Sequence, residues 1–180
     1  MQRVLVAGIT GSGKTTFARE LSRRLGLPFH EMDALYHGPG WVPRPTFVAD
    51  VAHVAAARRW VFDSHGYSEV RDLVWGRADT VVWLSYSRAV AVTRVTCRSF
   101  ARAWTAEPLF NGNTEGFAAW LDPEHPVRWV WSQYGVRRRD MIERFADPRY
   151  SGLTKVRLTS PAAARRWLDV AAPAPGGPAG

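Results

Sequence analysis

The stretch Gly8-Ile9-Thr10-Gly11-Ser12-Gly13-Lys14-Thr15 constrains the fold of this chain more than any other. It follows the short apolar run Val4–Ala7, which is typical of a strand buried on both faces. It precedes a segment whose apolar residues recur at helical spacing, at positions 17, 18, 21 and 25. A buried strand, a glycine-rich turn and a helix in this order predict the first unit of an α/β domain with a parallel sheet.

The residue types in this stretch predict a phosphate-binding loop. Gly8, Gly11 and Gly13 let the backbone approach a ligand where a Cβ atom would obstruct it. The Lys14 ammonium can reach the β- and γ-phosphates of a nucleotide, and the Thr15 hydroxyl can ligate Mg²⁺. We therefore expect ATP and Mg²⁺ as cofactors. The expected nucleotide-binding residues of this loop and the adjoining turn are Gly8, Thr10, Gly11, Ser12, Gly13, Lys14, Thr15 and Thr16.

The charge of the chain favours anionic partners. The net charge is +8 over 180 residues, and Lys14 and Lys155 are the only lysines among 24 basic residues. Nucleotides, phosphorylated metabolites or nucleic acid would suit such a surface; an arginine-rich compositional bias explains it equally well. Cys97 is the only cysteine, which fits a reducing cytoplasm. No apolar run approaches the roughly 18 residues of a membrane span.

Alternating strands and helices predict one three-layer domain over residues 1–170, with about five parallel strands and helices on both faces. Residues 94–125 contain an irregular, lid-like insert, and residues 171–180, made only of Ala, Pro and Gly, are expected to form a disordered tail. The predicted strands are Val4–Ala7, Phe29–Met32, Trp60–Phe62, Thr80–Leu84 and Lys155–Leu158. The predicted helices cover roughly residues 14–25, 46–59, 73–77, 87–104, 126–145 and 160–168.

Two acidic residues follow predicted strands, where ligands of parallel sheets lie. Asp63 ends the third strand and is expected to hold Mg²⁺ together with Thr15; capping of a loop or helix is the alternative. Asp33 ends the second strand and is expected to orient an acceptor hydroxyl or bind metal, with a turn-forming role as its alternative. His65 stands close behind Asp63 at the same strand end.

Arginine residues could neutralise the phosphates. Arg94, Arg98 and Arg102 are spaced four residues apart, so they share one face of a helix, where like charges repel unless anions balance them. A solvated face is the alternative. Arg71 and Arg77 are weaker candidates, and the run 137–139 is expected to be a solvated helix face. Ser160 and Pro161 could line the adenine ring, or simply begin a helix; Tyr36 and Trp41 could touch an acceptor.

The chain resembles small bacterial P-loop proteins related to adenylate kinase, including the DNA topology modulation (FlaR-like) proteins, over roughly residues 2–168. Besides Gly8–Thr15, the residues that carry the resemblance lie in 33–36, 39–41, 59–61, 71–73, 77–84, 109–113, 156–158 and 160–161. The resemblance implies an adenylate kinase-type fold, ATP and Mg²⁺ binding, and a mobile arginine-bearing lid near Arg94–Glu115. Nucleoside monophosphate kinases carry Asp-Gly-x-Pro-Arg after the third strand, whereas this chain has Asp63-Ser64-His65-Gly66-Tyr67, which argues against a nucleoside monophosphate acceptor.

These observations favour an ATP- and Mg²⁺-dependent kinase that acts on a small nucleotide, nucleoside or other hydroxyl or phosphate acceptor. Lys14, Asp33, Asp63, Arg94 and Arg98 are the expected catalytic residues. A regulatory ATPase or nucleotide switch that binds protein or nucleic acid is the alternative, and a kinase that acts on a nucleic-acid end is a third. Monomer and dimer both remain open.

Overall fold

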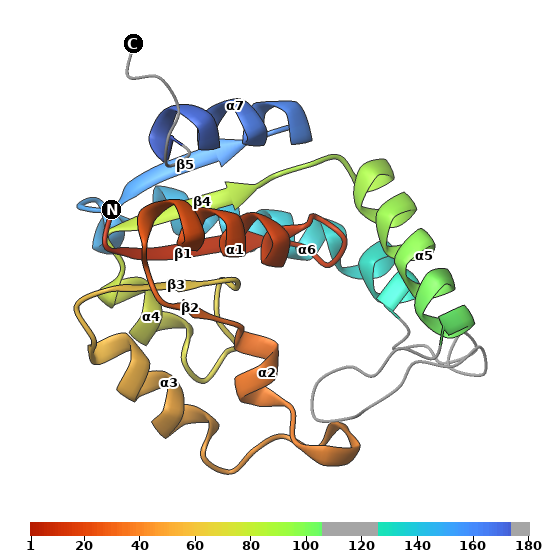
Figure 1. Ribbon diagram of the computed structural model, residues 1–180, viewed down its shortest axis with the longest axis horizontal. Helices are drawn as coiled ribbons and strands as arrows, with labels where there is room; N and C mark the ends of the chain where they lie inside the picture. The colour runs from red at the N-terminus through yellow and green to blue at the C-terminus, as the bar shows by residue number, and fades with distance from the viewer. Residues whose placement is uncertain (106–125, 174–180) are drawn as a thin grey trace.

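Five parallel strands form a single sheet in the order β2-β3-β1-β4-β5 (Figure 1). The computed structural model describes the backbone of residues 1–105 and 126–173, and the side chains of residues 1–101 and 128–173. All five expected strands are confirmed, with ends shifted by at most two residues. They are β1 (Arg3–Gly8), β2 (Phe29–His30), β3 (Trp60–Phe62), β4 (Thr80–Leu84) and β5 (Thr154–Leu158).

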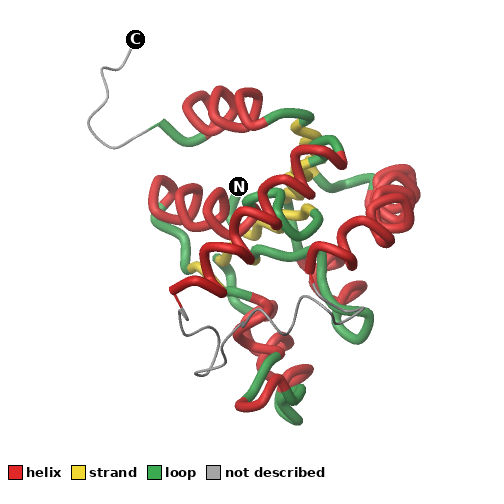
Figure 2. The backbone as a smooth tube through the Cα atoms, turned by 90° about the vertical axis from the view of Figure 1, so that its right-hand side faces the viewer, coloured by secondary structure: helices red, strands yellow, loops and turns green. Residues whose placement is uncertain are grey.

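Helices cover both faces of the sheet, as expected for a three-layer α/β fold (Figure 2). One face carries α1 and α7, and the other carries α3, α4 and α6. The α-helices are α1 (Lys14–Leu25), α2 (Met32–Tyr36), α3 (Phe47–Ala56), α4 (Arg71–Arg77), α5 (Arg88–Thr105), α6 (Pro126–Ala146) and α7 (Pro161–Ala171). Single 3₁₀ turns lie at Pro39–Trp41 and Pro148–Tyr150.

The central strand β1 supplies both cores through the alternation of its side chains. Leu5 and Ala7 pack with α3, α4 and α6, whereas Val4 and Val6 pack with α1 and α7. All four side chains are completely buried. Burial of a Val or Leu side chain contributes roughly 1.5–3 kcal/mol, so this strand anchors the loop that follows it.

The segment after β2 differs from the sequence prediction. The strand ends at His30, and residues Met32–Tyr36 form the short helix α2 in a region expected to be strand and loop. The Met32 amide donates a hydrogen bond to the Asp63 carboxylate at 3.0 Å. Because this amide has a side-chain acceptor, it needs no partner on a neighbouring strand, and the chain turns into a helix. Asp33 therefore lies in the first turn of α2 and not at a strand end.

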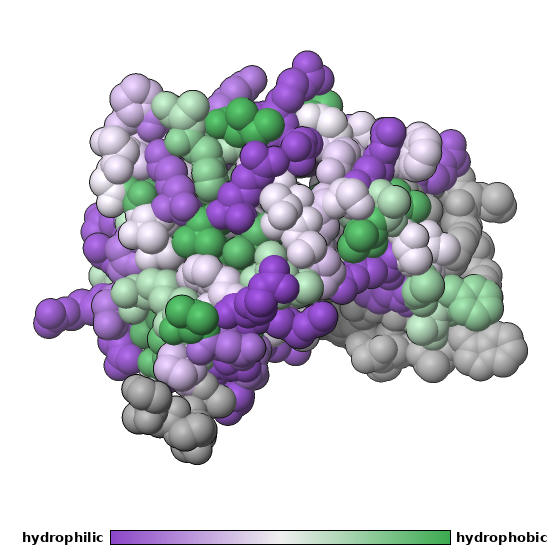
Figure 3. All heavy atoms as spheres, turned by 90° about the horizontal axis from the view of Figure 1, so that it is seen from above, coloured by the Kyte–Doolittle hydropathy of each residue, from purple (hydrophilic) through white to green (hydrophobic). Residues whose placement is uncertain are grey.

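The carboxyl-terminal helix α7 is longer than expected and continues to Ala171. The next residue, Ala172, is also buried, with 1% of its surface exposed. The rest of the expected tail, residues 174–180, lies outside the described residues, as do residues 106–125 of the expected insert. The face seen in Figure 3 is mainly hydrophilic, with scattered apolar side chains. No helix in the described part of the chain is long and apolar enough to cross a membrane.

Candidate functional site

The loop between β1 and α1 is folded so tightly that glycine is required. Gly11 and Gly13 have φ angles of 83° and 81°, in the left-handed region that favours glycine. A Cβ atom on Gly11 would collide with the carbonyl oxygen of Ala91 in α5. The Ser12 amide donates to the Ile9 carbonyl at 3.0 Å, which closes the turn. The sequence pattern therefore corresponds to a narrow loop that depends on glycine and is packed under a helix.

The start of α1 offers donors for an anion. The Phe17 amide donates to the Gly13 carbonyl at 3.0 Å, so the amides of Lys14, Thr15 and Thr16 precede the helical hydrogen-bond ladder. They lie at the positive end of the helix dipole. The Ser12 hydroxyl is buried and has no hydrogen-bond partner among the described residues. These groups fit a polyphosphate.

Thr15 and Asp63 meet at the carboxyl edge of the sheet, as the sequence predicted. The Thr15 hydroxyl donates to Asp63 Oδ2 at 2.6 Å, while Oδ1 accepts from the Met32 amide. Asp63 is 2% exposed. A hydroxyl and a carboxylate are the hard oxygen ligands that Mg²⁺ uses beside substrate phosphates and water. No group of three or more His, Cys, Asp or Glu side chains that could hold a metal ion occurs in the described residues.

Asp33 is paired with a residue that sequence reasoning missed. The Tyr67 hydroxyl donates to Asp33 Oδ1 at 2.9 Å. Tyr67 stacks on Tyr36 with ring centroids 4.0 Å apart and meets Phe47 edge-on at 5.4 Å. Burial, and then the charge of Asp33, raise the pKa of Tyr67, so it remains a donor. The loop after β3 thus fixes the carboxylate on α2.

The structure describes the side chains of two of the three arginines that were expected to share one face of α5. Arg94 reaches the loop, because its Nη1 donates to the Ser12 carbonyl at 3.2 Å. Its guanidinium also lies over the Tyr86 ring at 5.6 Å. Arg98 is half-buried one turn further along, and the Arg102 side chain lies outside the described residues. Arg94 thus contacts the glycine loop directly.

Ser160 and Pro161 lie at the start of α7, in agreement with the alternative interpretation that they simply begin a helix. The Ser160 hydroxyl accepts from the Ala163 amide at 3.2 Å, and Pro161 is the first helical residue. Proline suits this position because its missing N–H would have no partner there. A contact with adenine stays a prediction.

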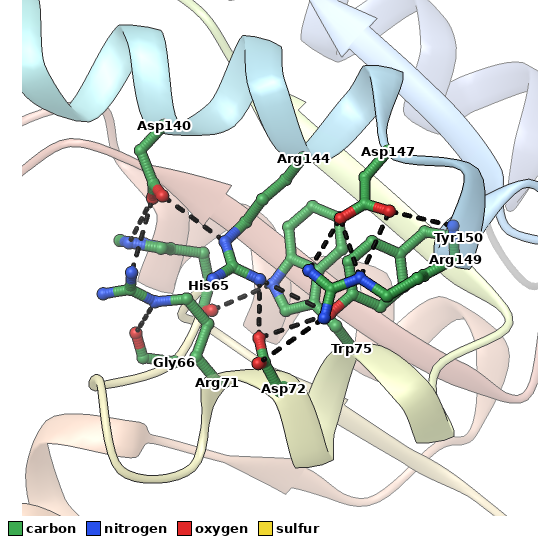
Figure 4. A network of polar contacts seen from close by, with 10 residues as sticks. All are labelled: His65, Gly66, Arg71, Asp72, Trp75, Asp140, Arg144, Asp147, Arg149 and Tyr150. Atoms are coloured by element: carbon green, nitrogen blue, oxygen red, sulfur yellow. Dashed lines mark hydrogen bonds and ion pairs between the residues drawn. The ribbon is translucent and has the colours of Figure 1, made fainter.

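The α4 and α6 helices are joined by a polar network centred on Asp140 and Arg144 (Figure 4). His65 lies at the edge of this network: its Nε2 is 3.8 Å from Asp140 Oδ2, and its carbonyl accepts from the Trp75 indole at 3.0 Å. Burial, then the charges of Arg71 and other basic neighbours including Lys14, lower the pKa of His65 to about 3. The imidazole of His65 is therefore neutral at neutral pH.

The prediction of a solvated 137–139 face is wrong for two of its three arginines. Arg137 and Arg138 are half-buried, and only Arg139 is exposed. Arg138 Nη1 donates to the Ser85 hydroxyl at 3.2 Å. Arg137 shares its helix face with Asp140, because the two are three residues apart. The spacing indicates only that the two side chains share a face; that this face turns inward follows from how α6 packs.

Several solved structures of kinases share this fold over nearly the whole chain. Shikimate kinase from Acinetobacter baumannii, in complex with shikimate, matches with a TM-score of 0.58 at 16% identity, over 95% of this chain and 93% of that one. A sugar kinase from Janibacter sp. HTCC2649 matches at 0.54 and 20% identity, over 93% and 92%. Deoxyadenosine kinase from M. mycoides with bound dCTP matches at 0.51 and 11% identity, over 93% and 97%.

The chain therefore has the α/β fold of the P-loop kinases of adenylate kinase type. A scan against protein-family models and a search of curated proteins each found no match. The resemblance to FlaR-like proteins accordingly stays a prediction that rests on motifs.

Proposed function

We propose that this protein is an ATP- and Mg²⁺-dependent phosphotransferase with a small-molecule acceptor. The observation that carries the proposal is the 2.6 Å contact between the Thr15 hydroxyl and the buried Asp63 carboxylate, beside the amides at the start of α1 that precede the helical hydrogen-bond ladder. A structural glycine turn has no need of a buried carboxylate facing a helix start, whereas a metal–phosphate site needs both.

In this proposal the residues divide between donor and acceptor. The loop amides and Lys14 bind the β- and γ-phosphates, and Arg94 lies close enough to the loop to approach them. Thr15 and Asp63 hold Mg²⁺, which when bound neutralises phosphate charge and polarises the transferred group. Asp33, held by Tyr67, accepts the proton of the acceptor hydroxyl. The similar solved structures include kinases named for shikimate, a sugar and deoxyadenosine, which supports a hydroxyl acceptor.

The test is formation of ADP from ATP and Mg²⁺ in the presence of single candidate acceptors: nucleosides, nucleotides, sugars and sugar acids. We expect one class to stimulate turnover. Lys14→Ala should abolish that turnover, and Asp33→Asn should lower kcat by about 10²–10⁴-fold with ATP affinity retained. Asp50→Asn on α3 is the matched control for the carboxylate. If no acceptor stimulates turnover while ATP binds, the protein is a nucleotide switch and not a phosphotransferase.

A further inference from the structure

A hollow of about 560 Å³ lies at the amino edge of the sheet, at the end of the strands opposite to the glycine loop. The residues that line it stand at the starts of three neighbouring strands: Gln2 and Arg3 at β1, Arg58 and Arg59 at β3, and Asp79 at β4. Because β1 runs from Arg3 to Gly8 at about 3.3 Å per residue, about 17 Å of strand separate the hollow from the loop. In Figure 1 this edge lies beside the N-terminus, away from α5.

Strand pairing brings the three arginines of the hollow together. Arg3 pairs in parallel register with Trp60, so it lies beside the residue that directly follows Arg58 and Arg59. The Asp79 amide donates to the Arg3 carbonyl at 2.9 Å, which brings the start of β4 to the same place. The backbone that carries the three guanidinium groups is therefore fixed by the hydrogen bonds of the sheet.

The lining residues contain one carboxylate, and the edge of the sheet already uses it. Asp79 Oδ2 accepts from the amides of Gln2 and Arg3 at 2.8 and 2.9 Å, and Oδ1 accepts from the Thr80 hydroxyl at 2.8 Å. Among the described residues, Asp79 forms no ion pair with an arginine. Its role is to hold β1 against β4, and three arginines with one aspartate leave an excess of two positive charges in the hollow.

The three arginines differ in how far they are engaged. Arg59 is fixed, because its Nη2 donates to the Gly26 carbonyl at the end of α1, at 3.1 Å. Arg58 is exposed and Arg3 is half-buried. Neither of these two guanidinium groups has an ion pair or a hydrogen bond in the part of the chain that the structure describes. A half-buried cation without an anion is unfavourable, and like charges nearby add to that cost.

We propose that this hollow binds a small dianion, a phosphomonoester or a dicarboxylate, at a site separate from the phosphate-binding loop. Two negative charges match the excess charge of the lining residues, and phosphate and carboxylate both suit the planar donors of arginine. The volume is within the range of small-molecule sites. A nucleic-acid backbone would instead need basic residues spread along a surface. The site shares no residue with the proposed phosphotransferase centre.

Calorimetric titration of glycerol phosphate and of succinate tests the site and separates the two sources of charge. We expect a single site for at least one of these dianions, and the Lys14→Ala variant should retain it because Lys14 lies at the other edge of the sheet. Arg58→Gln should weaken binding about tenfold, since a charged hydrogen bond is lost. Arg139→Gln is the matched control, because it removes the same charge from an exposed position outside the hollow.

A second variant keeps the test independent of folding. Arg58 is exposed, so Arg58→Gln should keep the wild-type Tm; if it does not, Arg3→Lys keeps the charge, removes the planar donors and should still weaken binding. Absence of binding by both dianions, equal affinity in the 58 and 139 variants, or loss of binding in Lys14→Ala overturns the proposal. Binding of a single-stranded oligonucleotide that Arg58→Gln weakens, without binding of either dianion, also overturns it and identifies a nucleic-acid surface.

Discussion

Replacement of Thr15 by valine tests whether the short bond to Asp63 is a strong, charge-assisted interaction. Valine keeps the shape and removes the hydroxyl. The bond is 2.6 Å long and its acceptor is 2% exposed, so the carboxylate would keep only the Met32 amide. Hydrogen bonds to charged groups contribute about 1.5–3 kcal/mol. We expect Thr15→Val to lower the free energy of unfolding by about 2 kcal/mol, which corresponds to a Tm about 4–8 °C lower at this chain length.

The assay is urea unfolding followed by tryptophan fluorescence, with Thr16→Val as the matched control. Thr16 is exposed in the same helical turn and forms no side-chain hydrogen bond among the described residues. Its valine variant carries the same change in helix propensity and should stay within about 0.5 kcal/mol of wild type. Asp63→Asn, alone and combined with Thr15→Val, completes a double-mutant cycle. Equal unfolding free energies for the two valine variants, or a coupling energy near zero, would refute the reasoning.

Two further predictions concern the loop and its surroundings. Gly11→Ala should cost about 3 kcal/mol, because a left-handed residue would gain a Cβ atom against the Ala91 carbonyl, whereas Gly135→Ala in open space should stabilise by about 0.5–1 kcal/mol; thermal melts that rank them otherwise contradict this. Between about pH 6.5 and 3 the unfolded state binds more protons than the folded one, because the folded pKa of His65 is lowered to about 3. Stability should therefore fall with acidification by up to about 1.4 kcal/mol per pH unit, and His65→Gln should flatten that slope.

Patterns local in sequence predicted most of the fold. The apolar runs of the strands, and the glycine and proline signals at helix ends, are short-range features that identify elements directly. Gly26 ends α1 in the left-handed conformation with φ 63°, and Ser160 caps α7, as the sequence indicated. The prediction of strand and loop after β2 was wrong, because the carboxylate of Asp63, 31 residues away, accepts from the Met32 amide and lets α2 begin. No local pattern contains that partner.

Some features of the candidate site could likewise be predicted from the sequence, and others could not. The glycine loop and the approach of Asp63 to Thr15 followed from motif and strand order. The Tyr67–Asp33 bond and the inward orientation of Arg137 depend on how α2, α4 and α6 pack together. Charge alone suggested a solvated run at 137–139, whereas the apolar Met141 and the ion-paired Asp140 fix which side of α6 faces the sheet.

The central position of β1 has a consequence for how the chain is made. Residues 3–5 of this strand pair with 60–62 of β3, and residues 4–8 pair with 80–84 of β4. During synthesis the glycine loop therefore emerges before both neighbours of its supporting strand, because β3 ends at Phe62 and β4 ends at Leu84. During that interval Val4 to Ala7 are exposed, and loop-closure entropy delays their pairing. We expect nascent chains that end before Thr80 to bind chaperones, and nucleotide affinity to arise only after β4 has left the exit tunnel.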